Sequence, residues 1–349
     1  RFKFFQINYV DGIKIIRVLV FPSQSPNIFH RLLYYSTFAL STIIPVICTK
    51  TDIFVLYHPP PSVIVPIFIR NLFKKTKFVY WINDMWPETL EVVGLKKSFV
   101  NIINKIHSYI YSKAKGIIVL SDGFKENLIK KGVLKNKIKV IHNWVNANEF
   151  RTTKSSNYIY SKYDIDKNNF HIMYAGSQGK MQELNVLINS FKYLKNFSNI
   201  KLILLGTGTE HQKLKKLVLD EKLNSQVHML GRVPSEDLPY LYNISDVMII
   251  HLKPLKINNI TIPHKIYGYM AAKKPIIGAI SGAGANEILN SNCGYVCNPG
   301  KPNIISELIL KMYNLSEEER KNLGLNGYDF IKHNRSITTQ GYSFLNILK

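Results

Sequence analysis

Acidic residues are scarce in this chain of 349 residues. It holds 23 Asp and Glu against 46 Lys and Arg, which gives a formal net charge of +23 at pH 7. The excess is not a basic tail, because residues 1–150 contain 21 basic and 8 acidic residues and the remainder contains 25 and 15. Such a surface attracts phosphate ligands, nucleic acid or an anionic membrane. A coding bias toward Lys, Ile and Asn is the alternative that requires no function.

Cysteine is scarce as well, with three residues, Cys48, Cys293 and Cys297. These cysteines and the ten scattered histidines show no metal-ligand spacing, so the sequence predicts no metal site. Cys293 and Cys297 flank an expected strand and are interpreted as reduced core thiols, which fits a cytoplasmic protein. No secretory signal is visible, and the first residue is Arg1 rather than Met, which suggests that N-terminal sequence is missing.

One uncharged run, residues 32–49, raises the question of a membrane. Its sequence, LLYYSTFALSTIIPVICT, is barely long enough to span a bilayer, which takes about 20 residues, and Ser, Thr, Tyr and Pro45 dilute it. Three placements therefore stay open. The run could span the membrane, form a buried helix, or lie in the membrane surface beside Arg31.

Strand-like and helix-like patterns alternate through the first 142 residues. The turn Val10-Asp11-Gly12 joins apolar runs at 3–8 and 13–20, which predicts a hairpin. The later alternation is typical of a parallel sheet covered by helices on both faces. The expected strands are 52–57, 77–82, 116–121 and 137–142, and the expected helices are 62–73, 98–114 and one that ends at Lys131.

A second alternating series follows a polar stretch at 143–169, where periodicity is lost and the interdomain linker is expected. We therefore expect an α/β fold of two doubly wound, Rossmann-like domains at 1–145 and 146–335. A C-terminal helix at 336–349 could pack back on the first domain. The strands of the second domain are expected within 171–179, 200–208, 226–233, 246–252, 274–280 and 294–299.

The segment IPHKIYGYMAAKKPIIG, residues 262–278, is the most informative part of the chain. A helix is expected to start just after Pro263, with His264 and Lys265 at its beginning, and to lead into a short apolar strand. Free N–H groups at a helix start form an anion site, and Lys265 adds a full positive charge beside them. The segment therefore predicts a phosphate site.

Small and basic residues follow four strands of the second domain, at the sheet edge where ligands bind in such folds. Tight turns between strand and helix need glycine in any case, so one such loop is weak evidence. Four loops beside Lys265 resemble a nucleotide-diphosphate pocket that bare backbone approaches closely. The candidates are Gly176, Ser177, Gly179 and Lys180, then Gly206 and Gly208, then Gly231 and Arg232, and finally Gly282, Gly284 and Ala285.

Two carboxylates and a tryptophan follow the expected strand at 77–82. Asp84 and Glu88 suit sugar hydroxyls, which donate to carboxylates, and the indole face of Trp86 suits a sugar ring. The structural alternative is that Asp84 caps a helix while Trp86 lies in the interdomain core. His107 and His142 have plain neighbours that indicate packing.

The motifs keep a characteristic order along nearly the whole chain. They are the DG hairpin, HPPPS, NDMWPE, SDGF, KVIHNWVN, YAGSQGKMQELNVLI, LLGTGTE, GRVP, IPHKIYGYMAAKKPIIG and NCGYV. This series resembles bacterial glycosyltransferases of family 4, and most closely the fucosamine-transferase-like members that extend O-antigen, capsule or colanic-acid units. The resemblance implies the GT-B fold of two facing Rossmann-like domains. It also implies transfer of a sugar from a nucleotide donor with retention of configuration and without a metal ion.

The chain departs from the family pattern at several positions. The family has a strand and a glycine-rich loop before the DG hairpin, so the resemblance implies a first domain truncated at its start. Ser177 and Gln182 stand where many members have an Arg and a Lys, and Gly268 replaces the usual acidic residue. By the same resemblance, Glu287 could reach a ribose hydroxyl.

These observations predict a retaining glycosyltransferase that moves an N-acetylated hexosamine from a UDP-linked donor to a lipid-diphosphate-linked glycan. Lys265 and Lys180 are expected to stabilise the leaving diphosphate, and Asp84 to act near the acceptor hydroxyl. No metal or other cofactor is expected, and the protein should lie peripherally on the anionic inner face of the plasma membrane. The alternatives are a nucleotide-sugar- or membrane-binding module that has lost catalysis and a basic nucleic-acid-binding protein. The sequence shows no helix-turn-helix, zinc or RNP motif for the latter, so no nucleic-acid partner is expected.

Overall fold

The computed structural model describes residues 4–22, 28–58, 61–88, 97–150 and 157–348. Its contacts divide the chain into two compact units, which are considered separately below. Unit 1 comprises residues 1–141 together with 344–349, and unit 2 comprises residues 142–343. The first junction lies close to the expected boundary at residue 145. Of the predicted linker and of HPPPS, residues 151–156 and 59–60 lie outside the described residues.

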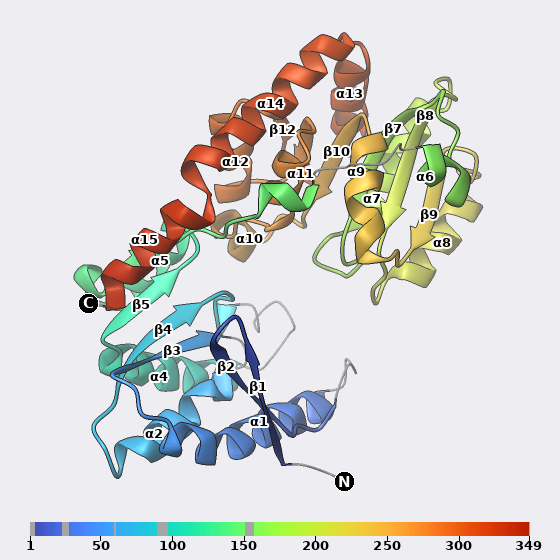
Figure 1. The fold of residues 1–349 in the computed structure, drawn as a ribbon. Coiled ribbons are helices and arrows are strands. Elements are labelled where there is room, and N and C mark those ends of the chain that lie inside the picture. Colours follow the sequence, from blue (N-terminus) through green and yellow to red (C-terminus); the bar gives the residue numbers. More distant parts are fainter. Residues whose placement is uncertain (1–3, 23–27, 59–60, 89–96, 151–156, 349) are drawn as a thin grey trace. The chain divides into compact units, whose positions relative to one another are not determined.

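Unit 1 is built on a parallel four-stranded sheet with the order β3-β4-β5-β6 (Figure 1). Branched aliphatic side chains fill its strands, and Val79, Ile117 and Val119 are fully buried. These residues fit a pleated surface that is covered on both sides. The strands are β3 (Ile53–His58), β4 (Lys77–Ile82), β5 (Gly116–Val119) and β6 (Ile138–Val140), and the helices and short 3₁₀ turns between them are η1 (Pro61–Ile64), α2 (Val65–Asn71), α4 (Lys97–Lys113), α5 (Asp122–Lys130) and η2 (Lys135–Lys137).

A hairpin and a long helix precede this sheet. Strands β1 (Phe5–Val10) and β2 (Ile13–Val18) pair antiparallel around Asp11 and Gly12, which both have positive φ, as the tight turn requires. Helix α1 (Ile28–Cys48) ends where the buried Arg70 donates to the carbonyls of Val46 and Ile47. Among the described residues, α1 is the one helix long and apolar enough to cross a membrane, and only 6% of its most apolar window is buried.

Unit 2 is built on a parallel six-stranded sheet with the order β12-β11-β10-β7-β8-β9. The first strand, β7, lies near the centre of the sheet. Strands β8 and β9 are added on one side of β7 and strands β10, β11 and β12 on the other, so the strand order reverses between β7 and β10. Ligands of doubly wound folds bind at the carboxyl ends of the strands beside such a reversal. The strands are β7 (Phe170–Ala175), β8 (Ile200–Leu205), β9 (Val227–Gly231), β10 (Val247–His251), β11 (Ile276–Ala279) and β12 (Gly294–Cys297).

Two apolar clusters cover the two faces of this sheet. Alternate residues of β7 enter different clusters, with Ile172 in one and Met173 in the other, as the period of two along a strand requires. The first cluster includes residues of α7 (Leu184–Ser190), η4 (Phe191–Leu194), α8 (His211–Asp220) and α13 (Pro302–Tyr313), and the second includes residues of α6 (Asn157–Lys162), α9 (Leu238–Ile244), α11 (Lys265–Ala271), α12 (Ala283–Asn290) and α14 (Glu317–Asn334). The short helix α10 (Lys256–Ile260) contributes to neither cluster. The remaining short turns are η3 (Ala147–Phe150) and η5 (Ser235–Asp237).

The last helix, α15 (Ile337–Leu348), begins in unit 2 and ends in unit 1. In unit 1 the ring of Phe344 lies 5.3 Å from that of Trp81, and the backbone of Leu348 accepts a hydrogen bond from Lys115 Nζ at 2.9 Å. Gly116 leaves room for Ile347, whose Cδ1 would stand 2.9 Å from an added Cβ. The chain end is therefore a structural part of unit 1.

The α/β fold class predicted from the sequence is confirmed. Each predicted strand is present and starts within two residues of the predicted position, because its apolar run is bounded by turn-forming residues. The short helix α10 was not predicted, because five residues are too few to show a helical period.

Candidate functional site

Lys265, the first residue of α11, points its ammonium at the end of strand β7. Its Nζ donates to Tyr174 Oη at 2.7 Å and lies 3.9 Å from the centre of the Tyr174 ring. A Cβ added to Gly176 would come within 2.6 Å of the same Nζ and would displace the ammonium, and the φ of 142° at Gly176 also favours glycine. Burial lowers the Lys265 pKa to about 7, with no carboxylate acting on it. Among the described residues, this amine therefore has no counterion.

Three of the four glycine loops meet beside this lysine. The Gly206 amide donates to the Gly231 carbonyl at 2.6 Å, and the Gly176 amide donates to the Leu205 carbonyl. A Cβ on Gly206 would stand 2.1 Å from the Gly176 oxygen, and one on Gly208 would stand 2.5 Å from the Gln178 oxygen. Backbone hydrogen bonds thus join the loops after β7, β8 and β9, and the close contacts of Gly206 and Gly208 leave no room for side chains at those two positions.

The fourth glycine loop has different neighbours. A Cβ on Gly282 would stand 2.0 Å from the carbonyl oxygen of Asn259, and one on Gly284 would stand 2.9 Å from Pro263. The loop therefore packs on α10 and on the residues that precede α11. It leads into α12, which begins at Ala283 with Ala285 in its first turn, where helical amides have no partner within the helix. These amides are suited to an anion.

The start of α11 itself offers fewer free amides than the sequence indicated. Ile266 donates its N–H to the Pro263 carbonyl, and Tyr267 donates to the His264 carbonyl, each at 3.1 Å. His264 is exposed, and its ring nitrogen lies 3.3 Å from the Trp144 carbonyl. The prediction that a free amide row at this helix start holds the phosphate is wrong for these two residues. Attraction of a phosphate to the start of α11 is therefore expected to come from the protonated Lys265 side chain.

Glu287 on α12 is buried, and its carboxylate pairs with Arg335. Arg335 donates to Glu287 Oε1 at 2.6 Å and to the Tyr267 hydroxyl at 3.3 Å. The second oxygen, Oε2, is buried, and no residue in the described ranges makes a hydrogen bond with it. Through Arg335, the Oε1 atom of Glu287 thus links α12 to α11 and to the end of α14. The resemblance did not indicate this structural role.

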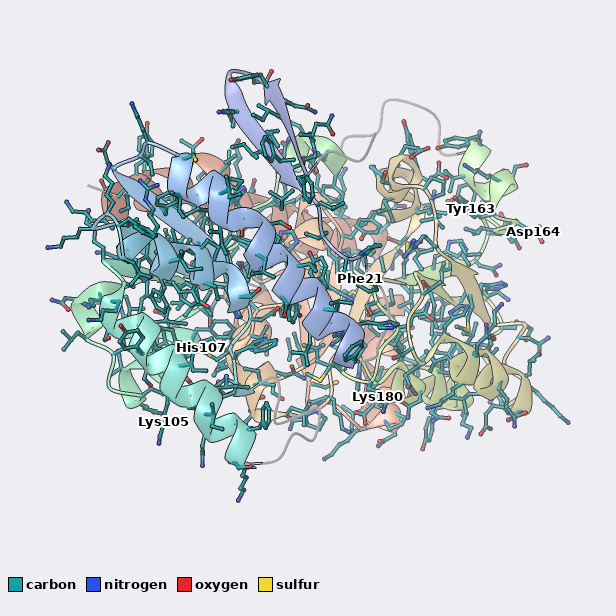
Figure 2. All side chains as sticks on the ribbon, turned by 90° about the horizontal axis from the view of Figure 1, so that it is seen from below. Phe21, Lys105, His107, Tyr163, Asp164 and Lys180 are labelled. Carbon is teal, nitrogen blue, oxygen red and sulfur yellow. The ribbon has the colours of Figure 1, made fainter. Side chains whose placement is uncertain are left out.

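The remaining donor-side candidates are exposed. Lys180 lies in the loop after β7, where Figure 2 labels it, and Arg232 follows β9. Ser177 is exposed, but its carbonyl accepts a hydrogen bond from Tyr174 Oη at 2.6 Å. Gly179 donates to the Gln182 side chain at 3.1 Å, so Gln182 orders the same loop. None of these exposed side chains contacts Lys265 in the hydrogen bonds of the described residues.

In unit 1, Asp84 follows strand β4. Partial burial raises the pKa of its carboxyl group. Trp86 packs against the rings of His58 and Tyr35, at 5.8 and 6.4 Å between ring centres. The predicted sugar platform is therefore partly covered by side chains of unit 1 itself. Glu88 pairs with Lys131 at 2.7 Å, which favours a structural role over hydroxyl recognition.

Two buried polar residues near these sites, His58 and Gln178, were not predicted as site residues from the sequence. His58 is fully buried, neither ring nitrogen has a hydrogen-bond partner among the residues that the structure describes, and burial lowers its pKa to about 3. His107, labelled in Figure 2, lies 3.2 Å from the Tyr111 hydroxyl, and its pKa is lowered to about 4, so it is the packing residue that was expected. In unit 2, Gln178 is fully buried and donates to the Gly206 carbonyl.

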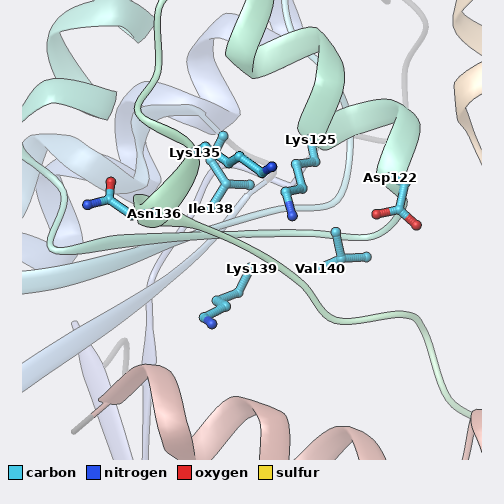
Figure 3. A pocket seen from close by; sticks show the side chains of 7 residues that line it. All are labelled: Asp122, Lys125, Lys135, Asn136, Ile138, Lys139 and Val140. Carbon is cyan, nitrogen blue, oxygen red and sulfur yellow. The ribbon is translucent and has the colours of Figure 1, made fainter.

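A basic depression in unit 1 lies apart from all predicted site residues. It has a volume of about 600 Å³ and lies against the edge strand β6 (Figure 3). Lys125, Lys135 and Lys139 line it together with Asp122. Within the described part of the chain, no group of three or more His, Cys, Asp or Glu is placed to hold a metal ion.

Comparison with known protein families identifies the two halves of the chain. Residues 6–149 match the model described as Glycosyltransferase Family 4, and residues 158–330 match the model described as Glycosyl transferases group 1. Together the two models cover nearly the whole chain. The chain therefore belongs to the family 4 glycosyltransferases with the GT-B fold.

Individual relatives agree with this assignment. The chain is 24% identical over 238 residues to the probable glycosyltransferase WbjE of Pseudomonas aeruginosa, an alignment of 67% of this chain and 59% of that protein. It is 26% identical over 180 residues (51% of this chain and 45% of the relative) to a Campylobacter jejuni enzyme named N-acetylgalactosamine-N,N'-diacetylbacillosaminyl-diphospho-undecaprenol 4-alpha-N-acetylgalactosaminyltransferase. The chain thus spans about half the length of the curated relatives it matches. The crystal structure of Anabaena HepE in complex with UDP-glucose superposes with a TM-score of 0.73 at 16% identity, over 92% of this chain and 84% of that one.

Proposed function

We propose that this chain transfers a sugar from a UDP-linked donor to a lipid-diphosphate-linked glycan, with retention of configuration. The observation that carries the proposal is Lys265, an amine that has no counterion in the described part of the chain and lies where three glycine loops meet at the carboxyl ends of β7, β8 and β9. The HepE structure contains UDP-glucose, and the Campylobacter relative is named for a diphospho-undecaprenol acceptor and an N-acetylated sugar. Both names support a donor and an acceptor of this chemistry. We place the reaction in the synthesis of O-antigen or capsule.

The chemistry requires that negative charge be stabilised on the leaving diphosphate. Lys265 would bind that diphosphate, together with the first-turn amides of α12 and the exposed Lys180. Groups that are fixed before the reaction stabilise developing charge without the cost of reorganisation. In this proposal no metal takes part, so lysine side chains and backbone amides supply the positive charge that faces the diphosphate.

Asp84 is proposed to act on the acceptor side. Its raised pKa makes it a better proton acceptor than an ordinary aspartate, so it is suited to receive a hydrogen bond from the attacking hydroxyl. The neighbouring Trp86 would then order the segment that carries Asp84, because its ring is held by His58 and Tyr35.

A membrane surface is proposed as the second partner, at the cytoplasmic face. Helix α4 exposes Phe99, Ile102, Ile106 and Tyr109, which recur at helical spacing on one face. Lys105, labelled in Figure 2, and Lys113 lie on the same helix, and Lys113 Nζ is 5.4 Å from the centre of the Tyr109 ring. Apolar side chains flanked by lysines are typical of helices that lie in an anionic membrane interface.

The test is a Lys265→Met variant assayed with UDP-sugars and a lipid-diphosphate acceptor. Turnover should fall by about 10²-fold, the usual size of lost electrostatic stabilisation. Lys216→Met removes an equal charge from an exposed position on α8 and should leave turnover unchanged. Normal turnover in Lys265→Met would overturn the assignment of the donor site. Tight UDP binding without transfer or donor hydrolysis, in a wild-type chain supplied with acceptor, would show a binding module instead.

A further inference from the structure

The hydroxyl of Tyr174 has two hydrogen-bond partners that belong to different elements. It donates to the Ser177 carbonyl at 2.6 Å and accepts from Lys265 Nζ at 2.7 Å. Since its single proton is given to Ser177, the hydroxyl can only accept from Lys265. The ring is fixed independently, because Tyr174 is fully buried in the first apolar cluster of unit 2. A rigid acceptor thus aims the lysine at the glycine loops.

No carboxylate within the described segments of the chain neutralises Lys265. The titratable groups on α11 and on the neighbouring elements of unit 2 are phenols, an imidazole and two carboxyls. They are Tyr174 on β7, Tyr242 on α9, Tyr267 and Tyr269 on α11, the exposed His264 just before α11, Glu287 on α12, which pairs with Arg335, and the exposed Glu149 on η3, which packs on α11. The environment therefore disfavours the charged amine until an anion arrives.

We propose that Tyr174 is the positioning residue of Lys265, and that binding of a nucleoside diphosphate at this lysine takes up one proton from solvent. This inference rests on the proposed function, because it assigns the diphosphate to Lys265. The ring and hydroxyl of Tyr174 hold the amine beside Gly176, and the incoming phosphate stabilises its protonated form. Donor affinity is thereby coupled to pH through one side chain.

The pH dependence follows from the empty site. Burial lowers the Lys265 pKa to about 7, so at pH 8 about nine in ten empty sites hold a neutral amine. Binding of the diphosphate raises this pKa, and UDP affinity therefore falls as pH rises above about 7. Above pH 7.5 the phosphate of UDP, with a second pKa of about 6, is already ionised and contributes little.

The experiment is calorimetric titration of the full chain with UDP between pH 7.5 and 9, in buffers of different ionisation enthalpy. Wild type should take up close to one proton per UDP at pH 8. Tyr174→Phe keeps the ring but removes the acceptor, so the amine is harder to protonate. We expect UDP affinity at pH 8 to fall about 10-fold, the effect of one hydrogen bond to a charged group, and the pH dependence of binding to move to lower pH. Tyr242→Phe removes a hydroxyl near Tyr174 that makes no contact with Lys265, and should behave as wild type.

The outcomes separate this inference from the proposed function. Lys265→Arg, which stays charged, should bind UDP with little proton uptake and a flat pH profile. If Lys265→Met binds UDP as well as wild type does, the donor-site assignment itself is wrong. If Lys265→Met loses affinity while wild type takes up no proton, only the present inference fails. A Tyr174→Phe variant with lower thermal stability and an unmoved pH profile would reduce Tyr174 to a packing residue.

Discussion

At the scale of single residues, the donor-side loops depend on backbone atoms that approach each other too closely for side chains. Gly206 has a φ of 102°, and a Cβ there would stand 2.1 Å from the Gly176 oxygen. Gly231 also has a positive φ, 72°, but its Cβ would meet nothing within 4 Å. Substitution of Gly231 therefore measures the conformational cost of a positive φ alone. Substitution of Gly206 measures that cost together with a steric clash.

We predict that Gly231→Ala lowers the free energy of unfolding by about 1–2 kcal/mol, the cost of a left-handed alanine. Gly206→Ala should cost more and should also weaken UDP binding, because the loops after β7 and β8 must separate. Gly341→Ala is the control, since no atom lies within 4 Å and α15 is helical there, so stability should rise by about 0.5–1 kcal/mol. Denaturant unfolding and UDP titration measure both effects. Equal losses in Gly206→Ala and Gly231→Ala would contradict the close-contact argument.

Much at this scale could be predicted from the sequence, but not the partners. Lys265 and the glycines were identified because their types and local spacing are informative. Tyr174 was missed, since 91 residues separate it from Lys265 and no local pattern reports that contact. Likewise, Arg335 lies 48 residues from Glu287, so the sequence could not show that this carboxylate is already engaged.

At the scale of elements, sequence periodicity predicted the strands well. It did not determine whether α1 lies in a membrane, in a membrane surface or in the protein interior. The run 32–49 allowed a span, a buried helix or an interfacial helix. The structure shows a helix that exposes Phe29, Leu32, Leu40 and Ile44 on one face while Ala39 is buried. Its tertiary packing follows from Arg70 and other distant residues, which the run itself cannot indicate.

The exposed stripe of α4 leads to a prediction at the same scale. Replacing Phe99 and Ile106 by Ser removes two large apolar groups, so binding to anionic phospholipid vesicles should weaken by at least about 10-fold. Vesicle co-sedimentation at several salt concentrations measures it, and zwitterionic vesicles should bind less. Leu219 and Leu289 are equally exposed on α8 and α12, and replacing both by Ser gives the matched control. Vesicle binding that survives in the α4 variant would place the membrane contact elsewhere.

At the scale of the whole molecule, the two units differ in how well they cover their apolar residues. Both large apolar clusters of buried residues lie in unit 2. Unit 1 instead exposes many large apolar side chains on the hairpin, α1, α2 and α4. Unit 1 is therefore expected to be the less stable of the two.

We predict two unfolding transitions in calorimetry, with unit 1 unfolding at the lower temperature. UDP at 100 times its dissociation constant should stabilise unit 2 by about 2.7 kcal/mol. For a unit of this size that corresponds to a rise of about 5–10 °C in the upper transition. The lower transition should stay where it was, and Lys265→Met should abolish the shift. A single transition that moves as a whole with UDP would contradict independent units.

The path of α15 has a consequence for how the protein is made. Unit 1 includes Phe344–Lys349, yet these residues follow the whole of unit 2 in the chain. A ribosome that adds about 5–20 residues per second needs about 10–40 s to translate the 142–343 segment between them. During that interval Trp81 and Gly116 lack their contacts with Phe344 and Ile347. The first unit to be synthesised is thus the last to be finished.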